Sequence, residues 1–329
     1  MKATLLKRLF SAVERGSNKD VIGVCKHIVE DQKELGHSNL AKVLEKTLEK
    51  AEKNSAEADS KSSATRGFTT LPSNKRDSSP LVQVIEHDQL RHHMVLPPGV
   101  EERFITIEKE YAARGRLATY GLKAKQKVLF YGPPGCGKSL GAERLAWSTG
   151  LPLFKVRFDT LISSYFGETA TNLGKVFESA TQKPCALFLD ECDTIARSRS
   201  EQNDVGEVSR VVNMLLQLLE DYRGDGIVIA ATNFYKSLDQ AIFRRFDEII
   251  EIPKPHIVEI ARLLKSTLST LNVDQKINLD TFAASLDGFS FSEVERIARN
   301  AAKRCVLANR KKVTQADLET ASAEVKRHF

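Results

Sequence analysis

Between a short apolar run and a stretch compatible with a helix lies Gly132-Pro133-Pro134-Gly135-Cys136-Gly137-Lys138-Ser139-Leu140. Glycines at these spacings let successive backbone N–H groups turn towards phosphate oxygens, and a helix beginning at Lys138 adds its positive dipole end. The Lys138 ammonium adds a full charge near the β- and γ-phosphates, and the Ser139 hydroxyl can hold Mg²⁺. A glycine-rich turn that binds nothing is the alternative, but strand, motif and helix occur in the required order. The sequence therefore predicts a P-loop for a nucleoside triphosphate.

A second apolar run, residues 185–189, leads directly into two adjacent carboxylates, Asp190 and Glu191. Such a run is typical of a parallel strand covered on both faces. Asp190 would then lie at the carboxyl end of the strand, beside the P-loop, where it can orient water on Mg²⁺, while Glu191 can polarise the attacking water. Adjacent acids can also simply begin a solvated loop. Their position after a buried run and downstream of a P-loop favours the catalytic interpretation.

A third apolar run, residues 227–231, is followed by Thr232 and Asn233. We expect Asn233 to emerge at the same sheet edge as Asp190, because ligand-facing residues of parallel sheets follow the carboxyl ends of the strands. Its uncharged amide could hold the attacking water or the γ-phosphate without changing the charge of the site. The alternative role is that of an ordinary turn residue.

Four segments together resemble the AAA family of ATPases. Gly132–Ser139 is similar to Walker A, Leu187–Glu191 to Walker B, Ala230–Asn233 to sensor 1, and Leu238–Asp247 to the second region of homology. The resemblance covers about residues 95–329 and implies hydrolysis of ATP, rather than GTP, with Mg²⁺ as cofactor. It assigns nucleotide contacts to residues 132–140 and Asp190, and places Mg²⁺ at Ser139 and, through water, at Asp190.

The same resemblance implies a shared active site. In the family, the arginines before the Phe-Asp pair reach the γ-phosphate of a neighbouring subunit, which makes Arg244 and Arg245 the implied fingers. An arginine that cannot reach its own P-loop can still supply charge to a neighbour's transition state. The chain is accordingly expected to form a homo-oligomer, usually a hexameric ring. A surface salt-bridge pair is the alternative that spacing alone leaves open.

Tyr165-Phe166-Gly167 resembles the aromatic–hydrophobic–glycine pore loop of unfolding and severing members of the family. A bulky ring on a flexible turn can grip an extended peptide without reading its sequence. The two aromatics could instead be core residues of the following helix. A second loop, residues 198–207, is expected to line the same pore.

The fold class expected is α/β: a P-loop NTPase parallel sheet sandwiched by helices, with a C-terminal all-α lid and a small N-terminal helical bundle. Residues 1–52 form the bundle, which binds an adaptor or protein substrate or only aids assembly; residues 53–80 form a flexible linker. Residues 81–254 form the large ATPase domain, including an alternating strand over residues 153–158, and residues 255–329 form the lid. Within the lid, Phe291 replaces a glycine of the family and Glu293 an aspartate, which puts the adenine contacts in doubt.

Composition fits a large α/β core with smaller helical units, because the 329 residues are 41% hydrophobic and 28% charged. The formal charge of +6 is spread along the chain and requires no nucleic acid. No apolar run approaches the length of a membrane span, and the start lacks a signal-peptide core. Five scattered cysteines without a C-x-x-C pair predict reduced thiols in the cytoplasm and no structural zinc.

Three functions remain for comparison. The favoured one is a ring ATPase that remodels, unfolds or disassembles a protein through its aromatic loop. A nucleotide-gated regulatory or scaffolding ATPase that controls a partner, such as a protease, is the second. A nucleic-acid motor is the third, and the loop around Tyr165 offers it neither basic side chains nor a helix-turn-helix.

Overall fold

The computed structural model describes residues 72–73, 79–161, 166–192, 205–235, 240–269, 271–274 and 277–327. The expected bundle over residues 1–52, nearly all of the linker, Tyr165 and most of the second pore loop lie outside these residues. The side chains of Phe166 and Gly167 are likewise not described. These predictions therefore stay predictions.

A six-stranded sheet forms the centre of the α/β region. Its order is β1 (Val82–Ile85), β3 (Leu153–Val156), β4 (Ala186–Leu189), β5 (Ile227–Thr232), β2 (Lys127–Tyr131) and β6 (Glu248–Glu251). The neighbouring strands β3, β4, β5, β2 and β6 run parallel to one another. At the edge of the sheet, β1 pairs antiparallel with β3. The β2, β4 and β5 strands are neighbours, so the three segments singled out by the sequence end at one edge of the sheet.

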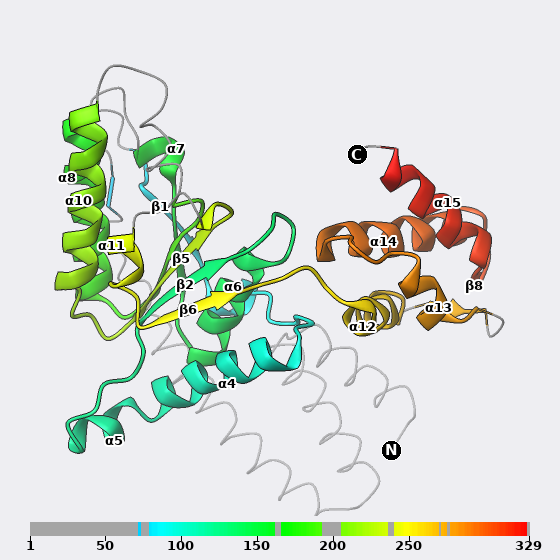
Figure 1. Ribbon diagram of the computed structural model, residues 1–329, viewed down its shortest axis with the longest axis horizontal. Coiled ribbons are helices and arrows are strands. Elements are labelled where there is room, and N and C mark those ends of the chain that lie inside the picture. Colours follow the sequence, from blue (N-terminus) through cyan, green and yellow to red (C-terminus); the bar gives the residue numbers. More distant parts are fainter. Residues whose placement is uncertain are drawn as a thin grey trace, which may run out of the picture. The chain divides into compact units, whose positions relative to one another are not determined.

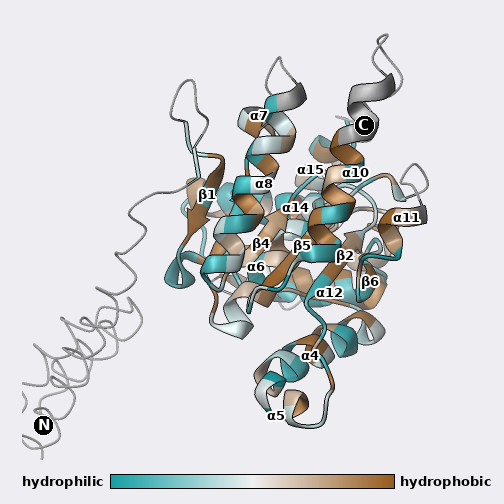
Figure 2. Ribbon diagram, turned by 90° about the vertical axis from the view of Figure 1, so that its left-hand side faces the viewer, coloured by the Kyte–Doolittle hydropathy of each residue, from teal (hydrophilic) through white to brown (hydrophobic). Residues whose placement is uncertain are grey.

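Helices cover both faces of this sheet, as Figures 1 and 2 show. On one face lie α4 (Pro98–Ala112) and α6 (Lys138–Thr149); on the other, α8 (Phe166–Gln182) and α10 (Val205–Asp221) lie side by side. Short elements complete the region: the 3₁₀ helix η1 (His87–Gln89), α5 (Arg114–Thr119), α7 (Phe158–Leu161) and α11 (Gln240–Phe243). This double cover explains why β4 and β5 are buried at every position.

The core on the α4–α6 face contains every second strand residue. Val128 and Phe130 of β2 and Ile227 and Ile229 of β5 belong to it, whereas Leu129 and Val228 between them do not. This alternation follows from the two-residue period of a strand. Phe130 stacks on Phe104 of α4, with ring centroids 5.3 Å apart, and thereby fixes the strand that leads into the P-loop.

The C-terminal region has a separate core and four helices: α12 (Ile257–Thr267), α13 (Leu279–Ala284), α14 (Phe291–Leu307) and α15 (Gln315–Lys326). Three of them begin with a capping box, in which the N-cap and third helical residues exchange hydrogen bonds: α12, α14 and α15. These caps satisfy backbone N–H groups that a helix start otherwise leaves unpaired.

The predicted fold class is confirmed, with three differences in detail. The sheet is not wholly parallel, because the edge strand β1 pairs antiparallel with β3. The C-terminal region is not all-α, because β7 (Asn272–Val273) and β8 (Lys312–Val313) form a parallel two-stranded sheet. Two-residue strands are too short to produce a periodic pattern. The expected strand over residues 153–158 ends at Val156, and the Arg157 carbonyl instead accepts the Leu161 N–H at 2.8 Å in the first turn of α7. No helix among the described residues is long and apolar enough to cross a membrane.

Candidate nucleotide-binding site

The P-loop joins the end of β2 to the start of α6, and two of its glycines are required by close contacts. Gly132 has φ +145°, and a Cβ there would lie 2.2 Å from the Ile252 carbonyl oxygen. Gly135 has φ +72°, and a Cβ there would lie 2.3 Å from Ser292 Oγ. Both positions combine a backbone conformation that favours glycine with no room for a side chain. Glycine at these two positions therefore permits this path of the loop, and the inward turn of its N–H groups stays a prediction.

Lys138 begins α6 and lies inside the loop. Its side-chain ammonium donates to the carbonyl oxygens of Gly132 at 2.8 Å and Pro133 at 2.9 Å, and the residue is 8% exposed. The first N–H groups of a helix have no partner within that helix and carry positive partial charge. The ammonium and the start of α6 thus concentrate positive charge at one place, which suits a phosphate group.

A cavity of about 460 Å³ opens beside this loop, within the size range of small-molecule sites. It brings together residues that the sequence assigned to nucleotide chemistry from three separate segments, although Gly132 and Pro133 of the P-loop do not line it. Its lining contains Pro134, Gly135, Cys136, Gly137, Lys138, Ser139, Leu140, Asp190, Glu191 and Asn233. Further lining residues come from the segment before α4 and from the C-terminal region: Arg91, His93, Met94, Val95, Leu263, Ser266, Phe291, Ser292 and Glu295.

Asp190 and Glu191 are adjacent in sequence but differ in surroundings. Asp190 Oδ2 accepts a hydrogen bond from Ser139 Oγ at 3.0 Å, so the carboxylate turns towards the P-loop. Glu191 is exposed and has φ +52°, an uncommon conformation for a residue with a Cβ. This left-handed residue changes the direction of the chain directly after β4. Asp190 is thus hydrogen-bonded to the P-loop, whereas Glu191 is exposed at the bend that follows β4.

The Ser139 hydroxyl and the Asp190 carboxylate fit the donor set of Mg²⁺. This ion prefers oxygen ligands and usually keeps several waters while it is held by one or two side chains and by substrate phosphates. The described residues contain no cluster of three or more histidines, cysteines or acids that could hold a metal without such phosphates. A bound nucleotide would add phosphate oxygens to these two ligands.

Asn233 follows the last residue of β5 and borders the cavity. The Thr232 hydroxyl accepts the Phe234 N–H at 2.9 Å, which turns the chain immediately after the strand. Asn233 thus lies in a turn and also lines the candidate site, so the two roles considered in the sequence analysis are compatible.

The two arginines of the second region of homology differ from each other. Arg245 forms an ion pair with Glu220 of α10 at 2.9 Å and is partly buried. Arg244 is exposed. Neither belongs to the lining of the 460 Å³ cavity. Arg245 thus has a partner within its own chain, as the salt-bridge alternative supposed, whereas Arg244 is exposed on the surface.

Phe166 is the first residue of α8, a 17-residue helix that continues to Gln182. Phe166 and Gly167 therefore lie in the first turn of a helix rather than in a free turn. Thr169 and Leu173, further along this helix, are buried. The backbone leaves open both sequence interpretations, a grip on substrate and a contact with the core.

Two contacts around the site have no counterpart in the sequence prediction. Arg91 donates to Glu143 of α6 from its backbone N–H at 3.0 Å and from Nε at 2.9 Å, and so fixes the segment before α4 against the P-loop helix. Lys155 Nζ donates to Asp190 Oδ2 at 2.9 Å. The only sequence signal for Lys155 was a charged residue within an apolar strand, and Arg91 gave no signal.

The C-terminal region contacts the P-loop through the start of α14. The Ser292 N–H donates to the Gly135 carbonyl at 3.0 Å, and Phe291 packs against the core of the α/β region. The glycine-to-phenylalanine departure is therefore accommodated by packing of the ring on that core. Glu293 accepts from the Ser290 N–H at 2.6 Å as the third residue of the capping box. The glutamate at position 293, which is longer than an aspartate, thus caps the start of α14.

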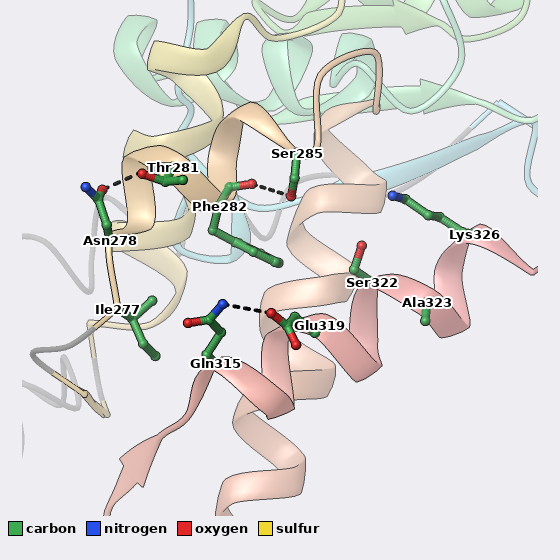
Figure 3. Close-up of a pocket in the computed structure, with 10 residues that line it drawn as sticks. All are labelled: Ile277, Asn278, Thr281, Phe282, Ser285, Gln315, Glu319, Ser322, Ala323 and Lys326. Carbon is green, nitrogen blue, oxygen red and sulfur yellow. Dashed lines mark hydrogen bonds between the residues drawn. The ribbon is translucent and has the colours of Figure 1, made fainter.

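A second cavity, of about 490 Å³, lies within the C-terminal region between α13 and α15 (Figure 3). Several of its polar side chains form hydrogen bonds with neighbouring residues. Gln315 Nε2 donates to Glu319 Oε1 at 2.7 Å, and Ser285 Oγ donates to the Phe282 carbonyl at 2.7 Å. It contains no P-loop residue, and we do not assign nucleotide to it.

The cysteines near the site are not suited to nucleophilic chemistry. Burial raises the pKa of the Cys136 thiol above its ordinary value and raises the pKa of Cys185 to about 12. Cys192 and Cys305 are also buried, and all four are free thiols. Because the thiolate is the reactive form, the raised pKa values make Cys136 and Cys185 poor nucleophiles.

Comparisons with known proteins agree with this geometry. The sequence profile of the ATPase family associated with various cellular activities (AAA) matches residues 128–254. An uncharacterized AAA family ATPase of Sinorhizobium fredii is 38% identical over 320 residues, which cover 97% of this chain and 94% of the relative.

Other relatives are longer. A putative 26S proteasome regulatory subunit homolog of Methanocaldococcus jannaschii is 36% identical over 63% of this chain and 57% of its own length. Proteasome-activating nucleotidase 2 of Haloferax volcanii is 34% identical over 62% of this chain and 52% of its own length. The match thus spans little more than half of these relatives. With near-complete coverage of the first relative and a P-loop site of the required form, the chain belongs to the AAA family of ATPases.

Proposed function

We propose that this ATPase is a ring motor that remodels, unfolds or disassembles a protein substrate. The observation that carries the proposal is the convergence of Lys138, Ser139, Asp190, Glu191 and Asn233 around one cavity of about 460 Å³. The choice of a protein substrate is supported by relatives that are named proteasome-activating nucleotidases. The similarity covers only about half the length of these relatives, so the protein substrate is inferred from similarity alone.

Within the site, the residues divide into binding and catalytic roles. The P-loop N–H groups and Lys138 bind the phosphates of ATP, and Ser139 with Asp190 holds Mg²⁺, which would neutralise phosphate charge when bound. Glu191 accepts a proton from the attacking water, and Asn233 orients that water or the γ-phosphate. A general base of this kind contributes about 10²- to 10⁴-fold to a rate.

The second catalytic element comes from a neighbouring subunit. Exposed Arg244 supplies positive charge to the neighbour's γ-phosphate, whereas Arg245 is engaged with Glu220. Such an arrangement needs a closed homo-oligomer, for which we propose a hexamer. Residues 1–52 would bind the adaptor or the substrate.

A mixing experiment tests the shared site. Arg244→Ala subunits alone and Glu191→Gln subunits alone should each hydrolyse ATP slowly. Mixed rings should regain part of the activity, because the intact Glu191 of an Arg244→Ala subunit can meet the intact arginine of its neighbour. Absence of any regain, with co-assembly verified by pull-down of differently tagged subunits, would contradict the shared site.

Substrate gripping is tested at Tyr165. Tyr165→Ala should leave the melting temperature and the basal ATPase rate unchanged and abolish mechanical work on a tagged protein substrate. Tyr120→Ala is the matched control, since Tyr120 is 78% exposed and lies outside the loop. If Tyr165→Ala instead lowers both the melting temperature and the ATPase rate, Tyr165 is a core aromatic.

That second result would favour the regulatory ATPase, in which hydrolysis switches a partner and no substrate passes through a ring. The start of α8 at Phe166 favours this second function, because an aromatic in the first turn of a helix can pack on the core instead of gripping a substrate. A nucleic-acid role receives no comparable support.

A further inference from the structure

Lys155 approaches Asp190 from the β3 strand, away from the P-loop. In the register of the sheet, Lys155 lies opposite Phe188 of β4, two residues before Asp190. Its ammonium lies 5.7 Å from the centre of the Phe188 ring and donates to Asp190 Oδ2 at 2.9 Å. Lys155 does not line the cavity of about 460 Å³ beside the P-loop. It is therefore not placed as a phosphate ligand.

The same carboxylate oxygen of Asp190 has two donors. Ser139 Oγ donates to Oδ2 at 3.0 Å from the side of the P-loop, and Lys155 Nζ donates to it at 2.9 Å. Two donors on one oxygen fix the orientation of the carboxylate. A positive charge at this distance also opposes the binding of a second cation by the same group.

The side of Asp190 that faces Lys155 is open. A cavity of about 400 Å³, lined by Gln83, Lys155, Val156, Arg157, Phe158, Asp190 and Glu191, adjoins the two acids. The Lys155 side chain is 37% exposed, so the long side chain can change its rotamer into this space without repacking the core. The ion pair is thus one that can open.

We propose that Lys155 is a positioning residue that holds Asp190 in place in the nucleotide-free enzyme and competes with a divalent cation for this carboxylate. The inference rests on the proposed role of Asp190. It assigns to Lys155 a function in setting how much Mg²⁺ the enzyme needs for tight nucleotide binding, rather than in contacting nucleotide.

The test is the Mg²⁺ dependence of nucleotide binding, measured with a fluorescent ADP analogue in the full-length protein and without turnover. Lys155→Met should lower the Mg²⁺ concentration at half-maximal binding by about fivefold, the effect of removing one partly exposed ion pair. Binding in EDTA should not change, because no phosphate contact is removed. Lys155→Arg, which keeps the charge, should behave like the wild type.

Two further comparisons isolate the role of Asp190. In an Asp190→Asn background, Lys155→Met should have no additional effect on Mg²⁺ dependence, because the competition requires the carboxylate. Lys265→Met is the matched control, since Lys265 forms a 3.0 Å ion pair with Asp280 in the C-terminal region. That variant should leave Mg²⁺ dependence unchanged.

The outcomes separate the two proposals. Unaltered Mg²⁺ dependence in Lys155→Met, a higher Mg²⁺ requirement, or an effect that persists without the Asp190 carboxylate would overturn the role of Lys155 alone. Wild-type binding that does not respond to Mg²⁺ at all would contradict the proposed site and, with it, this inference.

Discussion

The α/β region and the C-terminal helical region contribute to one cavity in different ways. The first supplies residues that follow the carboxyl ends of strands: the P-loop after β2, Asp190 after β4 and Asn233 after β5. The second supplies wall residues such as Leu263 and Phe291. The sheet thus positions the polar groups suited to chemistry on phosphate. The helices α12 and α14, which begin with capping boxes, supply another wall of the cavity. Mutations in the two regions should therefore separate turnover, nucleotide affinity and stability.

The largest effect is expected at the exposed arginine of the α/β region. Arg244→Ala should slow ATP turnover by about 1,000-fold, the range of a lost arginine finger, without changing the melting temperature. Arg245→Ala should instead remove an ion pair with Glu220 and affect turnover little. Parallel ATPase assays and thermal melts measure both. The reverse pattern would make Arg245 the finger.

Loss of phosphate charge is expected to come next. Lys138→Ala should weaken ATP binding by about 100-fold, because hydrogen bonds to charged groups are among the strongest in proteins. Titration of a fluorescent ATP analogue measures this change. Lys265→Ala, which alters an exposed lysine of the C-terminal region, serves as control. Equal affinity of Lys138→Ala and the wild type would remove the P-loop from the proposed site.

The wall contributed by the C-terminal region should have an intermediate effect. Phe291→Ala should raise the Kd for ATP by about tenfold, because a partly buried ring that packs on the α/β core also lines the cavity. Leu307→Ala at the other end of α14 is the control, since Leu307 is 83% exposed. An unchanged Kd in Phe291→Ala would mean that α14 does not help to close the site.

The smallest effect concerns stability alone. Hydrogen bonds from Arg310 lower the pKa of Asp317, which also accepts from the Thr314 N–H at 2.9 Å as part of the capping box. Because the pKa is lower in the folded state, the stabilisation is present above the unfolded-state pKa and is lost as pH falls through acidic values towards the folded-state pKa.

Asp317→Asn should accordingly lower the free energy of unfolding by roughly 1–2 kcal/mol at neutral pH, the usual range for a lost cap. The difference from the wild type should shrink in acid. Asp280→Asn is the control, because Asp280 is exposed. Urea unfolding monitored by circular dichroism at several pH values gives both quantities. A difference that is constant with pH would exclude the charge of Asp317 as its cause.

The local parts of the candidate site could be predicted from the sequence. The P-loop, Asp190, Glu191 and Asn233 each follow directly from an apolar strand, so a short motif carries both the chemistry and its position. Parallel order then brings these motifs together, which the cavity lining bears out.

What the sequence missed depends on pairing between distant segments. The contact of Lys155 with Asp190 spans 35 residues and that of Arg91 with Glu143 spans 52 residues. Edge strand β1 and the β7–β8 pair are likewise short segments whose partners are far along the chain. Neither hydrophobic periodicity nor a short motif specifies which distant segment a strand or side chain contacts, because tertiary packing determines these contacts.

We propose that the α/β region binds nucleotide through one set of groups and hydrolyses it through another. Glu191→Gln tests it most directly, because it removes the proposed base and leaves Lys138, Ser139 and Asp190 intact. The measurement pairs ATP affinity with the turnover rate in the same preparation. We expect wild-type affinity with turnover lowered by at least about 100-fold. Turnover equal to that of the wild type would exclude Glu191 as the base.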